Sequence, residues 1–105
     1  MVKNIFHDFP TQKDGEYFES LVSNSSFKFE RIISFGSING DSPWYDQDND
    51  EWVMVVKGNA ILLFSDPERE VRLSSGDYIL IKAHEKHCVK WTDPSQETIW
   101  LALHF

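Results

Sequence analysis

Two residues combine a reactive side chain with a position at the start of an apolar segment. Glu51 precedes the apolar run 52–56, and His87 opens the segment 87–91. A carboxylate and an imidazole can ligate a divalent metal together, or act as base and acid in a proton transfer. This pair is therefore the starting point for any chemistry that the chain performs.

Strands are the elements that must position this pair. Side chains on a strand alternate between its two faces, so Glu51 shares a face with Val53 and Val55. By the same rule His87 shares a face with Trp91. A carboxylate among apolar neighbours needs a partner, because an isolated buried charge is very costly. A metal ion, an imidazolium or a bound ligand could each be that partner.

The rest of the chain predicts a small all-β domain. At 105 residues there is room for one core, and an apolar content of 41% is ordinary for a globular chain. Short strand-like runs are separated by turn signals about every ten residues, which is typical of a β-sandwich or barrel. No helical pattern lies between these runs, so alternating parallel strands and helices are not expected.

One helix is expected before the strands begin. In the segment 14–23 four apolar residues fall on one helical face, with Asp14 as the N-cap. We therefore expect residues 1–34 to hold an irregular arm, this short helix and the first strand, and residues 35–105 to form the barrel. Both parts belong to one structural domain.

Charge and cysteine content narrow the partners. The formal net charge of −7 repels nucleic-acid phosphates and anionic lipids, so neither a nucleic acid nor a membrane is expected as a partner. The single cysteine excludes an intrachain disulfide, and no secretory signal is visible, so a cytoplasmic location is expected.

The runs 52–56 and 78–81 are apolar on both faces, which predicts that a second copy of the chain covers the sheet in a homodimer.

Two segments resemble the two sequence motifs of the cupin superfamily. In the first, Glu51 is followed after six residues by Gly58. In the second, a Gly-Asp turn precedes an apolar strand, and His87 lies ten residues after that aspartate. The resemblance covers roughly residues 35–105. It implies a jelly-roll barrel with a metal or small-molecule site inside, in a superfamily that hosts many functions.

The first motif departs from the family pattern. Metal-binding members usually place a His-x-His pair three or four residues before the motif glutamate. This chain has Trp44-Tyr45-Asp46-Gln47 there, which contains no histidine. Glu51 and His87 are therefore the residues that remain at the family's ligand positions.

The resemblance implies a divalent metal site as one alternative. Glu51 and His87 would be joined by a third ligand, and Asp46 is the candidate because it sits at a family ligand position. The metals considered are iron, manganese, nickel and zinc, with open positions for water or substrate. The other candidates for the third ligand are Gln47, Asp48, His84 and His104.

The second alternative is a pocket without metal that binds a small polar molecule. Its hydrogen-bonding groups would be Tyr45, Gln47, Glu51, His84 and His87, and its walls would include Trp44, Trp91 and Trp100. If Glu51 and His87 lie close together, one can act as base and the other as acid, as in isomerase or epimerase chemistry. Binding without catalysis fits the same residues, so the sequence does not decide whether the protein is an enzyme.

The third alternative is a non-enzymatic sensor or interaction domain. In that case Glu51 and His87 form a buried hydrogen-bonded pair that fixes strand register. His104 is expected to be partly exposed or bonded to backbone near the end of the chain. The acidic run 46–51 is expected to form a solvated loop at the pocket mouth that discourages anionic substrates.

Overall fold

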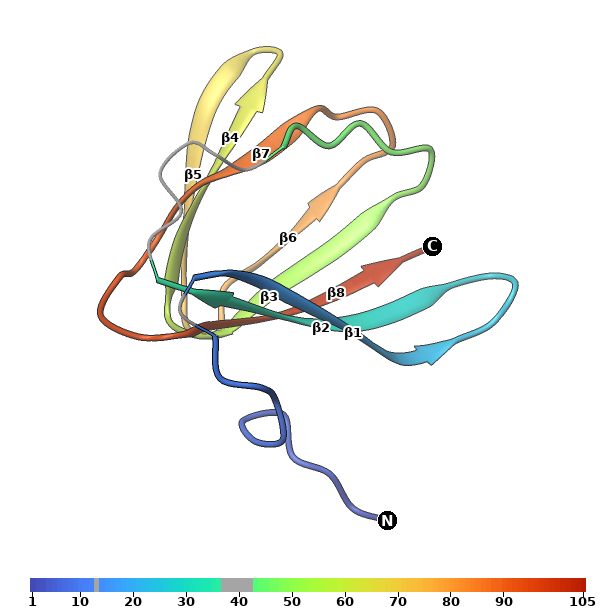
Figure 1. Ribbon diagram of the computed structural model, residues 1–105. Coiled ribbons are helices and arrows are strands. Elements are labelled where there is room, and N and C mark those ends of the chain that lie inside the picture. Colours follow the sequence, from blue (N-terminus) through green and yellow to red (C-terminus); the bar gives the residue numbers. More distant parts are fainter. Residues whose placement is uncertain (13, 37–42) are drawn as a thin grey trace.

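The computed structural model describes residues 1–12, 14–36 and 43–105. In these residues the chain forms two antiparallel sheets that pack face to face (Figure 1). The larger sheet has the strand order β1-β2-β8-β3-β6, and the smaller one β5-β4-β7. The strands are β1 (Gly15–Ser23), β2 (Lys28–Phe35), β3 (Glu51–Lys57), β4 (Asn59–Ser65), β5 (Glu68–Ser74), β6 (Tyr78–Ile81), β7 (His87–Thr92) and β8 (Thr98–His104).

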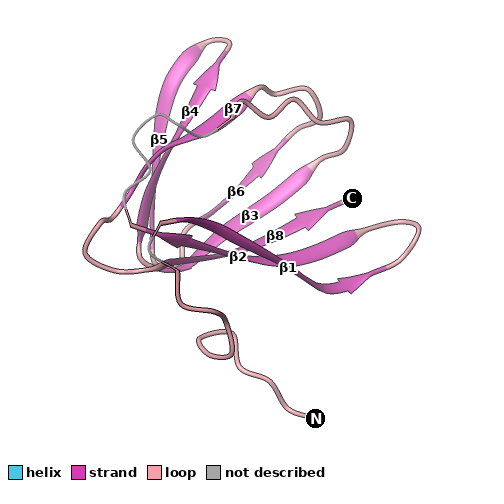
Figure 2. Ribbon diagram, viewed as in Figure 1, coloured by secondary structure: helices cyan, strands magenta, loops and turns pink. Residues whose placement is uncertain are grey.

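The prediction of an all-β domain is confirmed. Figure 2 shows strands joined by loops and turns, with no helix among the described residues. The described part of the chain therefore offers no helix that is long and apolar enough to cross a membrane. Alternating side chains produce this fold, because Val53 and Val55 of β3, together with Ala60 and Leu62 of β4, face one core between the sheets.

The predicted N-terminal helix is wrong, because the segment forms strand β1. This strand pairs with β2 from Gly15 opposite Phe35 to Ser23 opposite Lys28. The register shifts between Ser20 and Val22, which marks a bulge. Tyr17 packs on an outer apolar cluster and Phe18 lines the pocket, so both faces of this strand carry apolar residues. Together with the bulge, this produces spacings that resemble a helical face.

Gly58 connects the two sheets. It lies between the end of β3 in the larger sheet and the start of β4 in the smaller one, with a φ of +99°. A Cβ built there would lie 2.6 Å from Thr98 Oγ1 and 2.9 Å from Thr98 Cα. The first motif therefore ends on glycine because both the backbone conformation and the packing exclude a side chain.

The N-terminal arm covers part of the outer face of the larger sheet (Figure 1). Ile5 and Phe9 pack on a second apolar cluster formed by Ile33, Phe35 and Ile99. The buried Arg31 side chain holds the arm in place by donating hydrogen bonds to backbone carbonyls. Its acceptors are the carbonyl oxygens of Asn4, Ile5, His7 and Asp8.

The outer face of β3 and β6 remains partly open in the isolated chain. Tyr78 is 65% exposed and Leu80 is 45% exposed. Trp52 of β3 packs against Tyr78 with ring centroids 5.5 Å apart. Coverage of this face by a second copy, the homodimer expected from sequence, stays a prediction.

Candidate functional site

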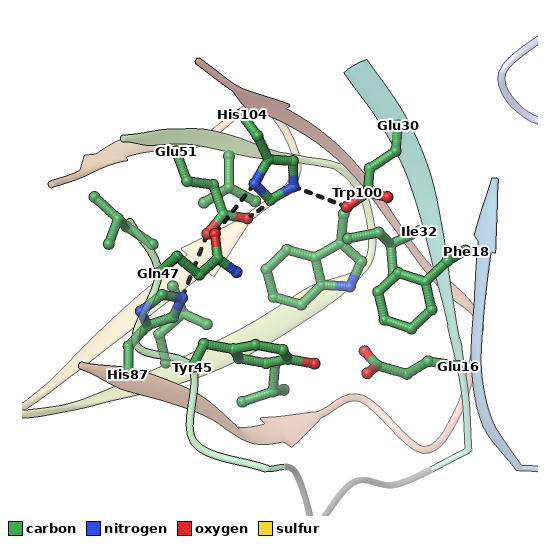
Figure 3. A pocket seen from close by; sticks show the side chains of 14 residues that line it. Glu16, Phe18, Glu30, Ile32, Tyr45, Gln47, Glu51, His87, Trp100 and His104 are labelled. Carbon is green, nitrogen blue, oxygen red and sulfur yellow. Dashed lines mark hydrogen bonds and ion pairs between the residues drawn. The ribbon is translucent and has the colours of Figure 1, made fainter. Parts of the chain in front are cut away.

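A pocket of about 70 Å³ opens between the two sheets (Figure 3). Strands β1, β2, β3, β4, β6, β7 and β8 contribute side chains to it, as does the loop before β3. Apolar side chains form much of its wall. The polar residues that line it are Glu16, Glu30, Tyr45, Gln47, Glu51, His87 and His104.

Glu51 and His87 meet inside this pocket. Each is the first residue of its strand, and both are more than nine-tenths buried, with 8% and 6% exposure. His87 Nε2 lies 3.4 Å from Glu51 Oε1. Glu51 Oε1 is nevertheless buried without a hydrogen-bond partner among the described residues. The contact is therefore an ion pair that leaves an acceptor available to a ligand.

The other ring nitrogen of His87 is held by the backbone. His87 Nδ1 lies 2.8 Å from the carbonyl oxygen of Glu85, which can only accept, so Nδ1 carries a hydrogen. Burial by itself lowers the pKa of His87, but the Glu51 carboxylate and the Glu85 carbonyl more than offset it. The pKa of His87 therefore lies above its usual value. Nε2 can thus carry a second proton, although it forms no hydrogen bond with Glu51 Oε1 at 3.4 Å.

His104, which the sequence offered only as an alternative third metal ligand, lines the pocket. Its Nε2 lies 2.8 Å from Glu30 Oε1 and 3.9 Å from Glu51 Oε2. Its Nδ1 lies 3.2 Å from Gln47 Oε1. Both nitrogens face oxygen acceptors, which favours the imidazolium. The hydrogen bond to Glu30 raises the pKa of His104, and this outweighs the opposing effect of burial.

Glu30 lines the pocket as well, and the sequence analysis did not identify it. Burial raises its pKa, but the hydrogen bond from His104 and the nearby Lys28 ammonium lower it further than burial raises it, so the net pKa is low. Lys28 Nζ lies 3.2 Å from Glu30 Oε2. Alternation along the last strand places Trp100, Ala102 and His104 on one face, and this pattern could have predicted that His104 points into the barrel. The contact with Glu30 could not be predicted in this way, because it depends on β8 lying beside β2 in the sheet.

Tyr45 and Gln47 both line the pocket. Tyr45 forms a short antiparallel bridge with His87, through backbone hydrogen bonds of 2.7 and 3.0 Å. The two rings lie 5.7 Å apart. Burial, followed by the negative charges of the pocket carboxylates, raises the pKa of Tyr45, so its hydroxyl remains a neutral donor.

Asp46 and His84 lie outside the pocket. Alternation turns Asp46 away from Tyr45 and Gln47, and its Oδ1 lies 2.9 Å from His84 Nδ1. Both side chains are more than half exposed, at 56% and 64%. They border a separate depression on the surface. The structure therefore brings neither residue to Glu51 and His87.

Trp91 also lies outside the pocket, although uninterrupted alternation along β7 would place it on the same face as His87. The pairing of β4 with β7 shifts by one residue, from Leu62 opposite Val89 to Ile61 opposite Trp91. A one-residue shift moves the following side chain to the other face. Trp91 consequently faces outward, where Arg72 lies 5.8 Å from the centre of its ring.

The described residues do not fit the three-ligand metal set drawn from the family resemblance. Asp46 is bound to His84 rather than directed at Glu51 and His87. Among residues 1–12, 14–36 and 43–105, no group of three or more His, Cys, Asp or Glu side chains is arranged to hold a metal ion.

The fold and the site define a small β-barrel protein with a polar pocket between its sheets. Residues 37–104 match the family described as the cupin domain, and the chain belongs to the cupin family. The resemblance seen in the two motifs is therefore confirmed. A search of curated proteins returned no match.

One solved structure is similar over nearly the whole chain. It is a protein from Ralstonia eutropha JMP134 named as a candidate mannose-6-phosphate isomerase, with 37% identity and a TM-score of 0.88. The alignment covers 99% of this chain and 96% of that one.

More distant structures share the fold alone. Hydroxypropylphosphonic acid epoxidase from S. wedmorenis is 14% identical, with a TM-score of 0.75 over 86% of this chain and 50% of that one. The polyketide cyclase RemF from Streptomyces resistomycificus is 19% identical, with a TM-score of 0.71 over 85% of this chain and 63% of that one.

Proposed function

We propose that this cupin binds a small polar molecule in the pocket and transfers a proton on it, with Glu51 as base and His87 as acid. The observation that carries the proposal is the buried Glu51 Oε1, which has no hydrogen-bond partner among the described residues and lies 3.4 Å from His87 Nε2. A buried carboxylate oxygen without a donor is costly, and a ligand hydroxyl or an acidic C–H would meet it.

The surrounding groups suit this division of roles. Glu51 accepts a proton from the ligand, and His87 Nε2 donates one to a ligand oxygen, so the ligand is rearranged without net gain or loss of protons. The raised pKa of His87 keeps its proton available near neutral pH. His104 Nε2, 3.9 Å from Glu51 Oε2, places a second basic side chain beside that carboxylate.

The charges of the pocket disfavour an anionic ligand. Three glutamates line it, and none of the described lining residues is Lys or Arg. The Ralstonia protein is named for an isomerisation, which is a reaction class that acid–base residues serve. We therefore propose the same reaction class, isomerisation, for this chain, but not the phosphorylated substrate for which the Ralstonia protein is named.

A solvent-exchange experiment tests the proposal. The protein is incubated in D₂O with separate panels of aldoses, ketoses, hydroxy acids and amino alcohols, and deuterium at carbon is followed by NMR. We expect incorporation into one class of compound, lost in Glu51→Gln and retained in Glu97→Gln. Glu97 is a partly exposed glutamate that pairs with Lys57 and does not line the pocket.

Two outcomes would overturn the proposal. One is exchange that survives Glu51→Gln. The other is the absence of both exchange and ligand-induced thermal stabilisation across all panels, which would favour the non-enzymatic interaction domain. Metal binding stays a prediction, and elemental analysis of protein purified without a chelating column, repeated on His87→Ala, tests it directly.

A further inference from the structure

The charges of the pocket are balanced at one end and not at the other. At the first end, Glu51 lies 3.4 Å from His87, and Glu30 lies 2.8 Å from His104 and 3.2 Å from Lys28. At the second end, Glu16 has no cationic partner among the described residues. Its described hydrogen-bond partner is the neutral hydroxyl of Ser34, at 2.9 Å.

Aromatic side chains border the same end of the pocket as Glu16. Figure 3 shows Glu16 with Phe18, Tyr45 and Trp100 around it, on the side away from His87 and Glu51. Trp100 is 3% exposed, whereas Phe18 is 50% exposed and lies at the opening. The faces of aromatic rings attract cations, and a carboxylate beside them supplies the opposite charge.

The geometry points to an ammonium subsite: Glu16, Phe18, Tyr45 and Trp100 bind the organic ammonium group of the ligand. The inference rests on the proposed function, because it places the ammonium group at one end of a molecule whose reacting atoms lie at Glu51 and His87. It narrows the substrate class to small amines that also carry a hydroxyl or carbonyl group.

A chain of hydrogen bonds orients Glu16 as an acceptor. Trp100 Nε1 donates to Ser34 Oγ at 3.0 Å, so the hydroxyl hydrogen of Ser34 is directed to Glu16 Oε2. Burial without a neighbouring cation raises the pKa of Glu16, and the Ser34 hydrogen bond offsets that only in part. A bound ammonium group supplies the missing charge.

The test uses tetramethylammonium chloride as the probe and the full chain as the protein. Amide and indole NMR signals are followed during the titration, with sodium chloride adjusted to keep ionic strength constant. The uncharged control of similar shape is tert-butanol, and the anionic control is acetate. We expect a saturable shift of the Trp100 indole signal with tetramethylammonium, and none with either control at equal concentration.

Variants separate this subsite from the rest of the pocket. We expect Glu16→Gln to weaken tetramethylammonium binding about tenfold or more, and Phe18→Leu to weaken it severalfold, because each removes one attractive contact. Glu97→Gln should bind like the unmodified protein. Phe18 is half exposed, so its variant retains the fold and keeps the test decisive if Glu16→Gln does not.

The subsite and the proposed function can fail separately. Glu51→Gln should abolish proton transfer and still bind tetramethylammonium within about threefold of the unmodified protein, because its charge lies at the other end. Unchanged tetramethylammonium affinity in Glu16→Gln, or equal binding of tert-butanol, would overturn the ammonium subsite and leave the proton-transfer proposal standing.

Discussion

The two ends of the pocket come from different parts of the chain. Glu51 and His87 begin the strands that carry the two family motifs, whereas Glu16 and Phe18 lie on β1, in the N-terminal hairpin outside those motifs. The motif end has an ion pair, and the hairpin end has a carboxylate with aromatic neighbours and no cationic partner among the described residues. If both proposals hold, the segment that matches the family supplies the reacting groups, and the N-terminal hairpin supplies the groups that select the ligand.

The largest expected effect comes from separating the two ends by substitution. Glu51→Gln should lower kcat about a hundredfold or more, because it removes the base. Glu16→Gln should instead raise KM with kcat nearly unchanged, because it removes a contact shared by ground state and transition state. Steady-state kinetics on the substrate found by deuterium exchange measures both. Equal losses of kcat in the two variants would contradict the division.

The second-largest effect is expected on the stability of the fold, from a substitution at Gly58, which connects the two sheets. Gly58→Ala should destabilise the fold by about 2 kcal/mol or more, because it adds a clash with Thr98 to an unfavourable positive φ. Gly76→Ala is the matched control, since φ is +91° there and nothing lies within 4 Å of the added Cβ. It should cost about 1 kcal/mol. Urea unfolding measures both, and equal losses would refute the steric explanation.

A third prediction concerns the pH dependence of stability that arises from the two histidines at the motif end of the pocket. The pKa values of His87 and His104 are raised in the folded state. Their stabilisation is therefore fully present below the unfolded pKa of about 6.5, and it is lost as pH rises through the folded values. Urea unfolding from pH 6 to 9 should show this decline.

Paired variants assign the pH dependence to these histidines. The double variant His87→Asn/His104→Asn should flatten the decline, whereas His84→Asn should retain it because His84 lies outside the pocket. A decline that persists in the double variant would show that other groups cause it.

The smallest effect on ligand affinity is expected from a substitution on the outer face of β3 and β6. Leu80→Glu places a charge on the exposed apolar surface and should convert the predicted homodimer to a monomer. Tetramethylammonium affinity should change less than twofold, because Leu80 lies on the face opposite the pocket. Light scattering after gel filtration measures the mass. A monomer in the unmodified protein would rule out the dimer.

Much of the barrel could be predicted from sequence because its signals are local. The apolar run 52–56 and the glycine at position 58 identify β3 and its end without knowledge of the partner strands. Patterns read from a single segment failed at Trp91 and in the segment 15–23. In both strands a register shift changes which side chains face the pocket. A bulge is fixed by pairing with another strand, so neither position could be read from its own segment.

The lining of the candidate site could be predicted in part for the same reason. Glu51 and His87, which both line the pocket, were proposed because they stand in recognisable motifs. Glu16 was concealed by the helical interpretation of its segment, and Glu30 by the unknown order of strands. His104 joins Glu30 only because β8 lies between β2 and β3, which is a long-range pairing.

The proton-transfer proposal is tested most directly by a crystal structure with the ligand that exchanges deuterium. We expect a ligand oxygen or reacting carbon in contact with Glu51 Oε1, the buried atom that has no hydrogen-bond partner among the described residues. A pocket in which Glu51 and His87 coordinate a metal ion would contradict it, as would a ligand bound at another site.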